Sequence, residues 1–94
     1  MLNFLFTKEK FQDGVIITWE NKYILRVSVP DGSVYTIGFE QAFEGNIDRL
    51  IHRNSIQRIN EDGQFNNCSF MPDYIFEHVI EYCKLRNFRF RIVE

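Results

Sequence analysis

Apolar and polar residues alternate along two neighbouring stretches of the chain, and this alternation predicts a β-hairpin. The first stretch covers residues 23–29 and the second covers residues 33–39. Between them, Pro30 suits the first corner of a type I turn and Gly32 suits a positive φ, which predicts a three-residue loop with a glycine bulge. The resulting register turns one apolar set toward the core: Tyr23, Leu25, Val27, Val29, Tyr35, Ile37 and Phe39.

The opposite face of this hairpin is mixed in character. It carries Ile24, Arg26, Ser28, Val34, Thr36 and Gly38. A two-residue loop would break the apolar face, because a slip of one residue moves every side chain to the other side of a strand. The bulged loop is therefore favoured, and the mixed face around Arg26 and Thr36 is left as a surface for binding.

Two further stretches show helical spacing. Residues 73–86 carry an apolar stripe at i, i+3, i+4 and i+7, which comprises Phe76, Val79, Ile80 and Cys83. Asp73 near the start, Lys84 near the end and Asn87 beyond it suit a helix with these limits. A shorter helix is predicted over residues 46–53, where Ile47, Leu50 and Ile51 have i, i+3, i+4 spacing.

The remaining patterns are extended. Residues 15–19 and 55–59 are rich in β-formers, and residues 88–93 alternate apolar side chains with Arg89 and Arg91. Residues 2–6 and 64–70 also suggest extended chain. The predicted fold is a single α+β domain over residues 1–94. It has an antiparallel meander sheet, with strands near 15–19, 23–29, 33–39, 55–59 and 88–93, packed by the main helix 73–86 and the short helix 46–53.

Length and composition restrict the class of protein. The 94 residues are 45% hydrophobic and include ten Phe, which excludes a disordered chain. No run of about 18 apolar residues occurs, so no membrane partner is expected. The apolar start has no basic segment before it and is not typical of a signal peptide. We therefore expect a cytoplasmic protein.

Candidate catalytic and metal-binding residues lack the spacing that their chemistry needs. His52, His78, Cys68 and Cys83 form no pair typical of zinc ligands, so neither a metal nor any other cofactor is expected. Both cysteines are expected to be free thiols, with Cys83 in the core. Glu77 and Glu81 fall on the polar side of the predicted helix, and no nucleophile stands beside a base. The sequence therefore predicts a protein that is not an enzyme.

The basic residues gather at the C-terminal end. Residues 84–94 have a net charge of +3, against −5 for residues 1–83 and −2 for the whole chain. Within this tail Arg89 and Arg91 are expected on one strand face, about 6.6 Å apart. Two interpretations stay open: the tail contacts phosphates of a nucleic acid, or its charges protect an edge strand from aggregation. The candidate contact residues are Lys84, Arg86, Arg89, Arg91 and, on the hairpin, Arg26.

Residues 15–77 resemble a bacterial family known as domain-of-unknown-function family 2442. The matching elements are residues 23–35 with their Pro-Asp-Gly turn, then Phe39, residues 58–63 and the Pro72–Ile75 segment. The family often has a Trp-Pro-x-Gly stretch before the final Pro-Asp, and residues 64–69 depart from it here. The resemblance implies a small α+β domain without an assigned activity, found beside toxin–antitoxin-like genes or fused to helix-turn-helix domains. It implies no catalytic or binding residues.

These observations lead to two functional hypotheses. The first is a non-enzymatic interaction or regulatory accessory module, antitoxin-like in its role, which binds an unidentified protein partner. The second is a protein associated with nucleic acid through the basic C-terminal strand. A homodimer is a separate expectation, formed if an uncovered edge at residues 88–93 or 15–19 pairs across a two-fold axis.

Overall fold

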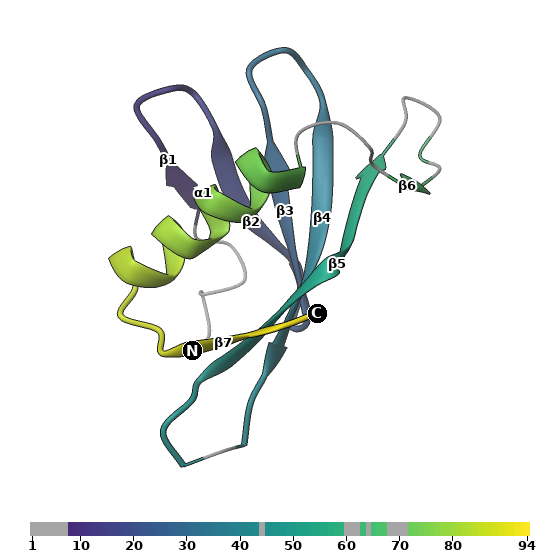
Figure 1. Cartoon of the computed structure of the whole chain (residues 1–94). Helices are drawn as coiled ribbons and strands as arrows, with labels where there is room; N and C mark the ends of the chain where they lie inside the picture. Colours follow the sequence, from purple (N-terminus) through teal and green to yellow (C-terminus); the bar gives the residue numbers. More distant parts are fainter. Residues whose placement is uncertain (1–7, 44, 60–62, 64, 68–71) are drawn as a thin grey trace.

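The computed structural model describes residues 8–43, 45–59, 63, 65–67 and 72–94. These described residues form a mixed α+β structure with a sheet of seven strands and one helix (Figure 1). The elements are β1 (Lys8–Lys10), β2 (Ile16–Asn21), β3 (Ile24–Ser28), β4 (Val34–Gln41), β5 (Arg49–Ile59), β6 (Phe65–Asn67), α1 (Pro72–Leu85) and β7 (Phe90–Val93).

The sheet follows chain order from β1 to β6, and each of these neighbours pairs antiparallel with the next. Strand β7 departs from this order, because it pairs with the first half of β5 and runs parallel to it. The chain reaches that position by passing through α1, as a parallel connection requires a crossover segment. Figure 1 shows β7 crossing the lower part of the sheet beside β5.

The predicted hairpin register is confirmed by β3 and β4. Leu25 lies opposite Ile37, and Val27 lies opposite Tyr35. The Gly32 amide donates to the Val29 carbonyl at 2.9 Å, and the Val29 amide donates to the Ser33 carbonyl at 2.9 Å. Gly32 has φ +95°, which is the conformation that the bulged loop needs and that glycine adopts without strain.

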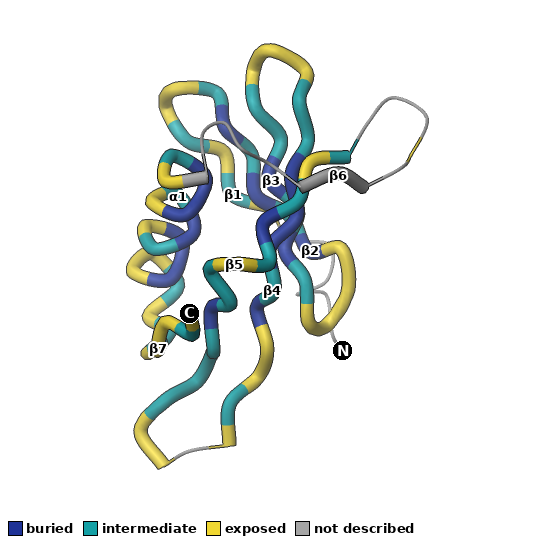
Figure 2. Tube along the Cα trace, turned by 45° about the vertical axis from the view of Figure 1, so that its right-hand side comes forward, coloured by how far each residue is buried: buried dark blue, intermediate teal, exposed yellow. Residues whose placement is uncertain are grey.

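The core lies between the sheet and the inner face of α1. Figure 2 shows buried segments on the side of the helix that faces the strands. The fully buried side chains from the predicted strands and helix include Leu25, Val27, Phe39, Val79 and Cys83, each with no more than 1% of its surface exposed. The helix also buries Ile75 and Tyr82, and the Tyr82 hydroxyl accepts a 3.0 Å hydrogen bond from the Trp19 indole N–H.

The helix limits agree closely with the sequence prediction, and the termination has a clear physical cause. Asn87 has φ +59°, the left-handed conformation that commonly stops a helix. The Phe88 amide donates to the Cys83 carbonyl at 2.9 Å, and the Asn87 amide donates to the Lys84 carbonyl at 3.3 Å. These two bonds satisfy carbonyls that the last helical turn would otherwise leave unpaired.

The predicted short helix over residues 46–53 is wrong. Residues 45 and 46 form a turn, and the chain from Arg49 onward belongs to β5. Strand β5 pairs with β4 on one side and with β7 on the other, so its backbone is satisfied by partners far away in the sequence. Such pairing overrides a short apolar spacing that is compatible with both helix and strand. The predicted strand 55–59 is the second half of this longer element.

Two side chains of the hairpin also differ from expectation. Tyr23, predicted in the core, is 56% exposed because it lies in the β2–β3 turn, just before β3 begins. Its backbone keeps the predicted register, since the Tyr23 carbonyl accepts from the Phe39 amide at 2.7 Å. Thr36, predicted on a face free to bind, is only 4% exposed.

One of the two segments considered as an uncovered edge, residues 15–19, lies inside the sheet. Residues 15–19 do not form an edge, because β2 lies between β1 and β3. The predicted terminal strand 88–93 begins later, at Phe90, and it joins the sheet in parallel rather than as an antiparallel neighbour. The extended chain predicted for residues 2–6 and the environment of Cys68 lie outside the described residues.

Candidate functional site

The predicted contact residues do not come together as one basic surface. Arg26, on β3, forms an ion pair with Glu20 at 2.7 Å. Arg89 donates from Nε and Nη2 to the two carboxylate oxygens of Asp48, each at 3.1 Å. This pairing raises the pKa of Arg89, and the same hydrogen bonds lower the pKa of Asp48. Arg26 and Arg89 are therefore both engaged by carboxylates.

The other three predicted residues lie at the end of α1 or between there and the end of the chain. Lys84 is exposed in the last turn of α1, and Arg91 is exposed on β7. Arg86 follows the helix and approaches Glu9 of β1, with a 3.7 Å distance between Nη2 and the carboxylate oxygen. That distance is compatible with charge attraction but too long for a hydrogen bond.

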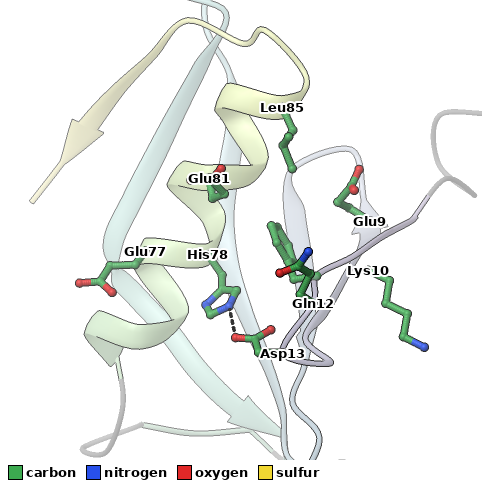
Figure 3. A pocket seen from close by; sticks show the side chains of 9 residues that line it. Glu9, Lys10, Gln12, Asp13, Glu77, His78, Glu81 and Leu85 are labelled. Carbon is green, nitrogen blue, oxygen red and sulfur yellow. Dashed lines mark hydrogen bonds and ion pairs between the residues drawn. The ribbon is translucent and has the colours of Figure 1, made fainter.

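A groove of about 670 Å³ separates α1 from β1 and the β1–β2 turn. Figure 3 shows His78 projecting from the helix into this groove, where it meets Asp13 of the turn. The His78 Nε2 atom lies 2.8 Å from the Asp13 carboxylate, and Nδ1 lies 2.9 Å from the Tyr74 carbonyl oxygen. Glu77 and Lys10 also line the groove, but Figure 3 shows their charged ends pointing away from the pair.

Asp13 is the centre of the hydrogen bonds in the groove. One of its oxygens accepts from the Val15 amide at 3.2 Å, and the other accepts from the Tyr74 hydroxyl at 3.0 Å and from His78. The Val15 amide makes the largest contribution to lowering the pKa of Asp13, followed by His78 and Tyr74. Burial raises the pKa of Tyr74, as does its bond to Asp13.

The geometry around His78 limits the chemistry available to it. Both ring nitrogens face acceptors, so both contacts are satisfied only when each nitrogen carries a hydrogen. A ring in that state has no free lone pair with which to accept a proton from a substrate. Phe11 and Tyr74 also pack against the ring, with centroid distances of 5.2 and 4.5 Å. The arrangement favours a structural role, in which His78 holds α1 against the β1–β2 turn.

A second hollow, of about 550 Å³, lies beside the extended β4–β5 hairpin. Two aromatic residues line it with largely exposed side chains: Phe43 is 91% exposed and Tyr23 is 56% exposed. Glu40 and His52 line it too, and the His52 Nε2 atom lies 2.9 Å from the Glu40 carboxylate. We call Tyr23, Glu40, Gln41, Phe43 and His52 the aromatic hollow.

The side of the sheet that bears this hollow follows from strand alternation. Phe39 and Ile51 are paired neighbours whose side chains are buried in the core beneath α1. The next residues, Glu40 and His52, therefore project from the opposite face. The aromatic hollow is thus on the side of the sheet that faces away from the helix.

The sequence did not predict the aromatic hollow. Tyr23 was expected in the core, Phe43 lay next to the predicted short helix, and His52 was placed within that helix. The hollow depends on the pairing of β4 with β5, which brings His52 opposite Gly38. Exposed aromatic residues carry no distinct sequence signal when the strand that aligns them is mistaken for a helix.

The described residues contain neither a metal-binding cluster nor a membrane-spanning helix. No group of three His, Cys, Asp or Glu side chains there is arranged to hold a metal ion. The helix of this part of the chain is not long and apolar enough to cross a membrane.

No family model, curated protein or solved structure matches this chain. The resemblance to domain-of-unknown-function family 2442 therefore stays a prediction.

Proposed function

We propose that this protein is a non-enzymatic interaction module that binds a protein partner through the aromatic hollow. The observation that supports the proposal is the exposure of Phe43, at 91%, and of Tyr23, at 56%, on one concave surface. Grouped apolar side chains that remain in contact with water are typical of surfaces that become covered in a complex.

The chemistry of the hollow suits a protein partner. Aromatic side chains bury a large apolar area and dominate the binding energy of many interfaces. The Glu40–His52 pair, at 2.9 Å, supplies a polar boundary beside them. We therefore expect an apolar side chain of the partner to lie between Tyr23 and Phe43, with polar groups of the partner around it.

The resemblance to domain-of-unknown-function family 2442 suggests the class of partner, a toxin-like protein, and this class is part of the proposal. A domain of that kind would act as an accessory or antitoxin-like protein in the cytoplasm. The genes that flank this one give a direct test of the class, because a neighbouring toxin-like gene would supply the expected partner.

The proposed function is tested by co-purification of the tagged full chain from its host. We expect a stoichiometric protein partner with the unchanged chain, and its loss when Tyr23→Ala and Phe43→Ala are combined. Truncation of a central interface aromatic commonly costs about 2 kcal/mol or more of binding free energy. Circular dichroism of the double variant should match that of the unchanged chain, since both side chains are exposed.

Leu85→Ala is the matched control. Leu85 is also a large exposed apolar residue, at 51%, but it lies on α1 at the groove. The proposal requires that this variant keep the partner. A partner that is retained by the Tyr23 and Phe43 double variant, or a chain that purifies alone, would contradict the proposed function.

Nucleic-acid association through the basic tail is the alternative proposal, and the charge arrangement favours it less. Arg89 already has a bidentate carboxylate partner, so a phosphate would have to compete with Asp48. The matched test is a salt-dependent mobility shift with DNA or RNA, repeated with Arg89→Ala and Arg91→Ala together. A shift that this double variant abolishes would support the alternative, and the absence of binding at low salt would exclude it.

A further inference from the structure

A third hollow, of about 350 Å³, lies where the loop end of the β4–β5 hairpin meets the segment that follows α1. Its lining includes two arginines from distant parts of the chain, Arg49 of β5 and Arg86 after α1, together with Gln41, Asn87 and Asp48. We call this the arginine hollow. Its composition differs from that of the other two hollows because cations and amides predominate.

The Arg49 guanidinium lies against aromatic rings, and no group in the described part of the chain accepts a hydrogen bond from it. Its guanidinium carbon lies 4.9 Å from the ring centre of Trp19, 5.4 Å from that of Phe39 and 5.3 Å from that of Phe88. Partial burial lowers the pKa of Arg49. Cation–π attraction acts on the charge but leaves the N–H donors in the plane of the guanidinium without acceptors.

Arg86 has one donor that is sealed from solvent. Its Nε atom is buried, and no described group accepts a hydrogen bond from it. Its guanidinium lies 5.3 Å from the ring centre of Tyr82, and its contact with Glu9, at 3.7 Å, is too long for a hydrogen bond. A buried donor without an acceptor normally costs about 1–3 kcal/mol, so an acceptor that reached Arg86 Nε would relieve this cost. The Arg49 donors are not buried in this way and are open to a ligand in the hollow.

Asp48, the acidic residue of the hollow, does not supply that acceptor. One of its oxygens accepts from the Arg89 amide at 2.8 Å and from Arg89 Nε at 3.1 Å, and the other accepts from Arg89 Nη2 at 3.1 Å. The hydrogen bonds of Asp48 are therefore made to Arg89, although its charge also acts on Arg49. Arg86 has the Glu9 carboxylate at 3.7 Å, which leaves its N–H groups without a hydrogen bond to that acceptor.

We propose that the arginine hollow binds a small oxyanion, a carboxylate or a phosphate, through the guanidinium groups of Arg49 and Arg86. The planar donor fork of arginine matches both kinds of anion. Gln41 and Asn87 add amide groups at the same surface. Gln41 lines both this site and the aromatic hollow, but the test uses Arg49, Arg86 and Trp19 and does not depend on the proposed protein partner.

Trp19 gives an internal probe of this site. It is the only tryptophan of the chain, and the Arg49 guanidinium lies over its ring. The full-length protein is titrated with inorganic phosphate, and separately with acetate, at constant ionic strength while indole fluorescence is recorded. We expect a saturable change with at least one of them, and the anion that saturates at the lower concentration identifies the preferred class.

Three arginine variants distinguish binding at the arginine hollow from a general effect of charge. We expect Arg49→Gln and Arg86→Gln each to weaken binding roughly tenfold or more, as the loss of a charge-assisted hydrogen bond implies. Arg86→Gln leaves the residue against Trp19 unchanged, so it keeps the test valid if Arg49→Gln fails to fold. Arg91→Gln, an exposed arginine on β7, is the matched control and should bind as the unchanged chain does.

Three results would overturn the proposal. One is an equal response to sodium chloride, which would indicate a general effect of salt. Another is an affinity that neither Arg49→Gln nor Arg86→Gln changes. A chain whose fluorescence does not respond in a saturable way to phosphate or acetate would have no such site.

Discussion

At the scale of single residues, hydrogen-bond partners determine the role of each polar side chain. The His78 side chain is only 14% exposed on α1, and it contacts Asp13 across the groove. Asp13 in turn joins the Val15 amide, the Tyr74 hydroxyl and His78. These contacts link the β1–β2 turn to α1, so a single carboxylate connects two elements.

The first prediction concerns Asp13 and pH. The pKa of Asp13 is lower in the folded chain than in the unfolded chain, mainly because of the Val15 amide. Its contribution to the free energy of unfolding is therefore present above the unfolded pKa, about 3.9, and is lost as pH falls through the folded pKa. We expect Asp13→Asn to make the acid limb of the stability profile shallower, measured by urea unfolding at a series of pH values between 2 and 6.

Glu77→Gln is the control for this measurement. Glu77 is exposed on the same helix, and no interaction of its side chain is found in the described part of the chain. Loss of the Glu77 carboxylate should leave the acid limb of the stability profile as steep as in the unchanged protein. Identical slopes for Asp13→Asn and the unchanged chain would show that Asp13 does not contribute.

At the scale of elements, the irregular pairing of β4 with β5 has the largest consequence. Thr36 pairs with Gln57, whereas Gly38 pairs with His52, so β5 holds several extra residues opposite Ile37. Ser55 compensates for the interrupted pairing, because its hydroxyl accepts from the Gly38 amide at 2.7 Å and donates to the His52 carbonyl at 2.6 Å. The irregularity lets β5 bend, as Figure 1 shows, and bring its two halves to different neighbours.

The second prediction tests this bend. A Cβ atom at Gly38 would lie 3.1 Å from the Ser55 hydroxyl and 3.2 Å from the His52 Cβ atom, both closer than most real contacts. We expect Gly38→Ala to lower the free energy of unfolding by about 1–3 kcal/mol through overpacking. Chemical denaturation followed by circular dichroism measures the change.

Gly45→Ala is the matched control. A Cβ atom there meets no described group within 4 Å, so its effect should be small. Ser55→Ala should also destabilise, by about 1–3 kcal/mol, because it leaves the Gly38 amide without its acceptor. Equal stability of the two alanine variants at Gly38 and Gly45 would contradict the close packing at the bend.

At the scale of the whole molecule, α1 and the sheet enclose one shared core. Its members come from β2 through β5 and from α1, and they include Trp19, Phe39, Ile51, Tyr82 and Cys83. Phe39 joins the two layers, since its ring lies 5.5 Å from that of Trp19 and 6.3 Å from that of Tyr82. Exposure of any of these side chains should therefore require the helix to separate from the sheet.

The third prediction uses Cys83 as a probe of that separation. Burial raises the pKa of the Cys83 thiol to about 12, so the reactive thiolate is scarce in the folded protein. In a Cys68→Ser background, we expect a thiol reagent at pH 8 to label Cys83 only as fast as the protein unfolds. The labelling rate should rise with urea in the same way as the unfolding rate.

Leu85→Cys in a chain without the other two cysteines provides the comparison. Leu85 is 51% exposed on the same helix, two residues beyond Cys83. That thiol should be labelled rapidly without denaturant. Equal labelling rates for the two positions would show that the helix opens locally without loss of the core.

The features that the sequence determined by itself are local ones. The Pro30–Gly32 turn set the register of β3 and β4, because the three-residue loop allows one alignment that keeps an apolar face. The stripe on residues 73–86 predicted α1 and the burial of Cys83, and Asn87 marked its end. Each of these depends on residues within a few positions of one another.

Only the tertiary structure decided the rest. Residues 49–52 became strand because β4 and β7 both pair with them, and that pairing joins segments about 10 to 40 residues apart. The same contacts placed Tyr23 and Phe43 on one hollow and Arg49 and Arg86 on another. Both proposed binding surfaces therefore depend on long-range strand pairing, which the local spacing of apolar residues does not encode.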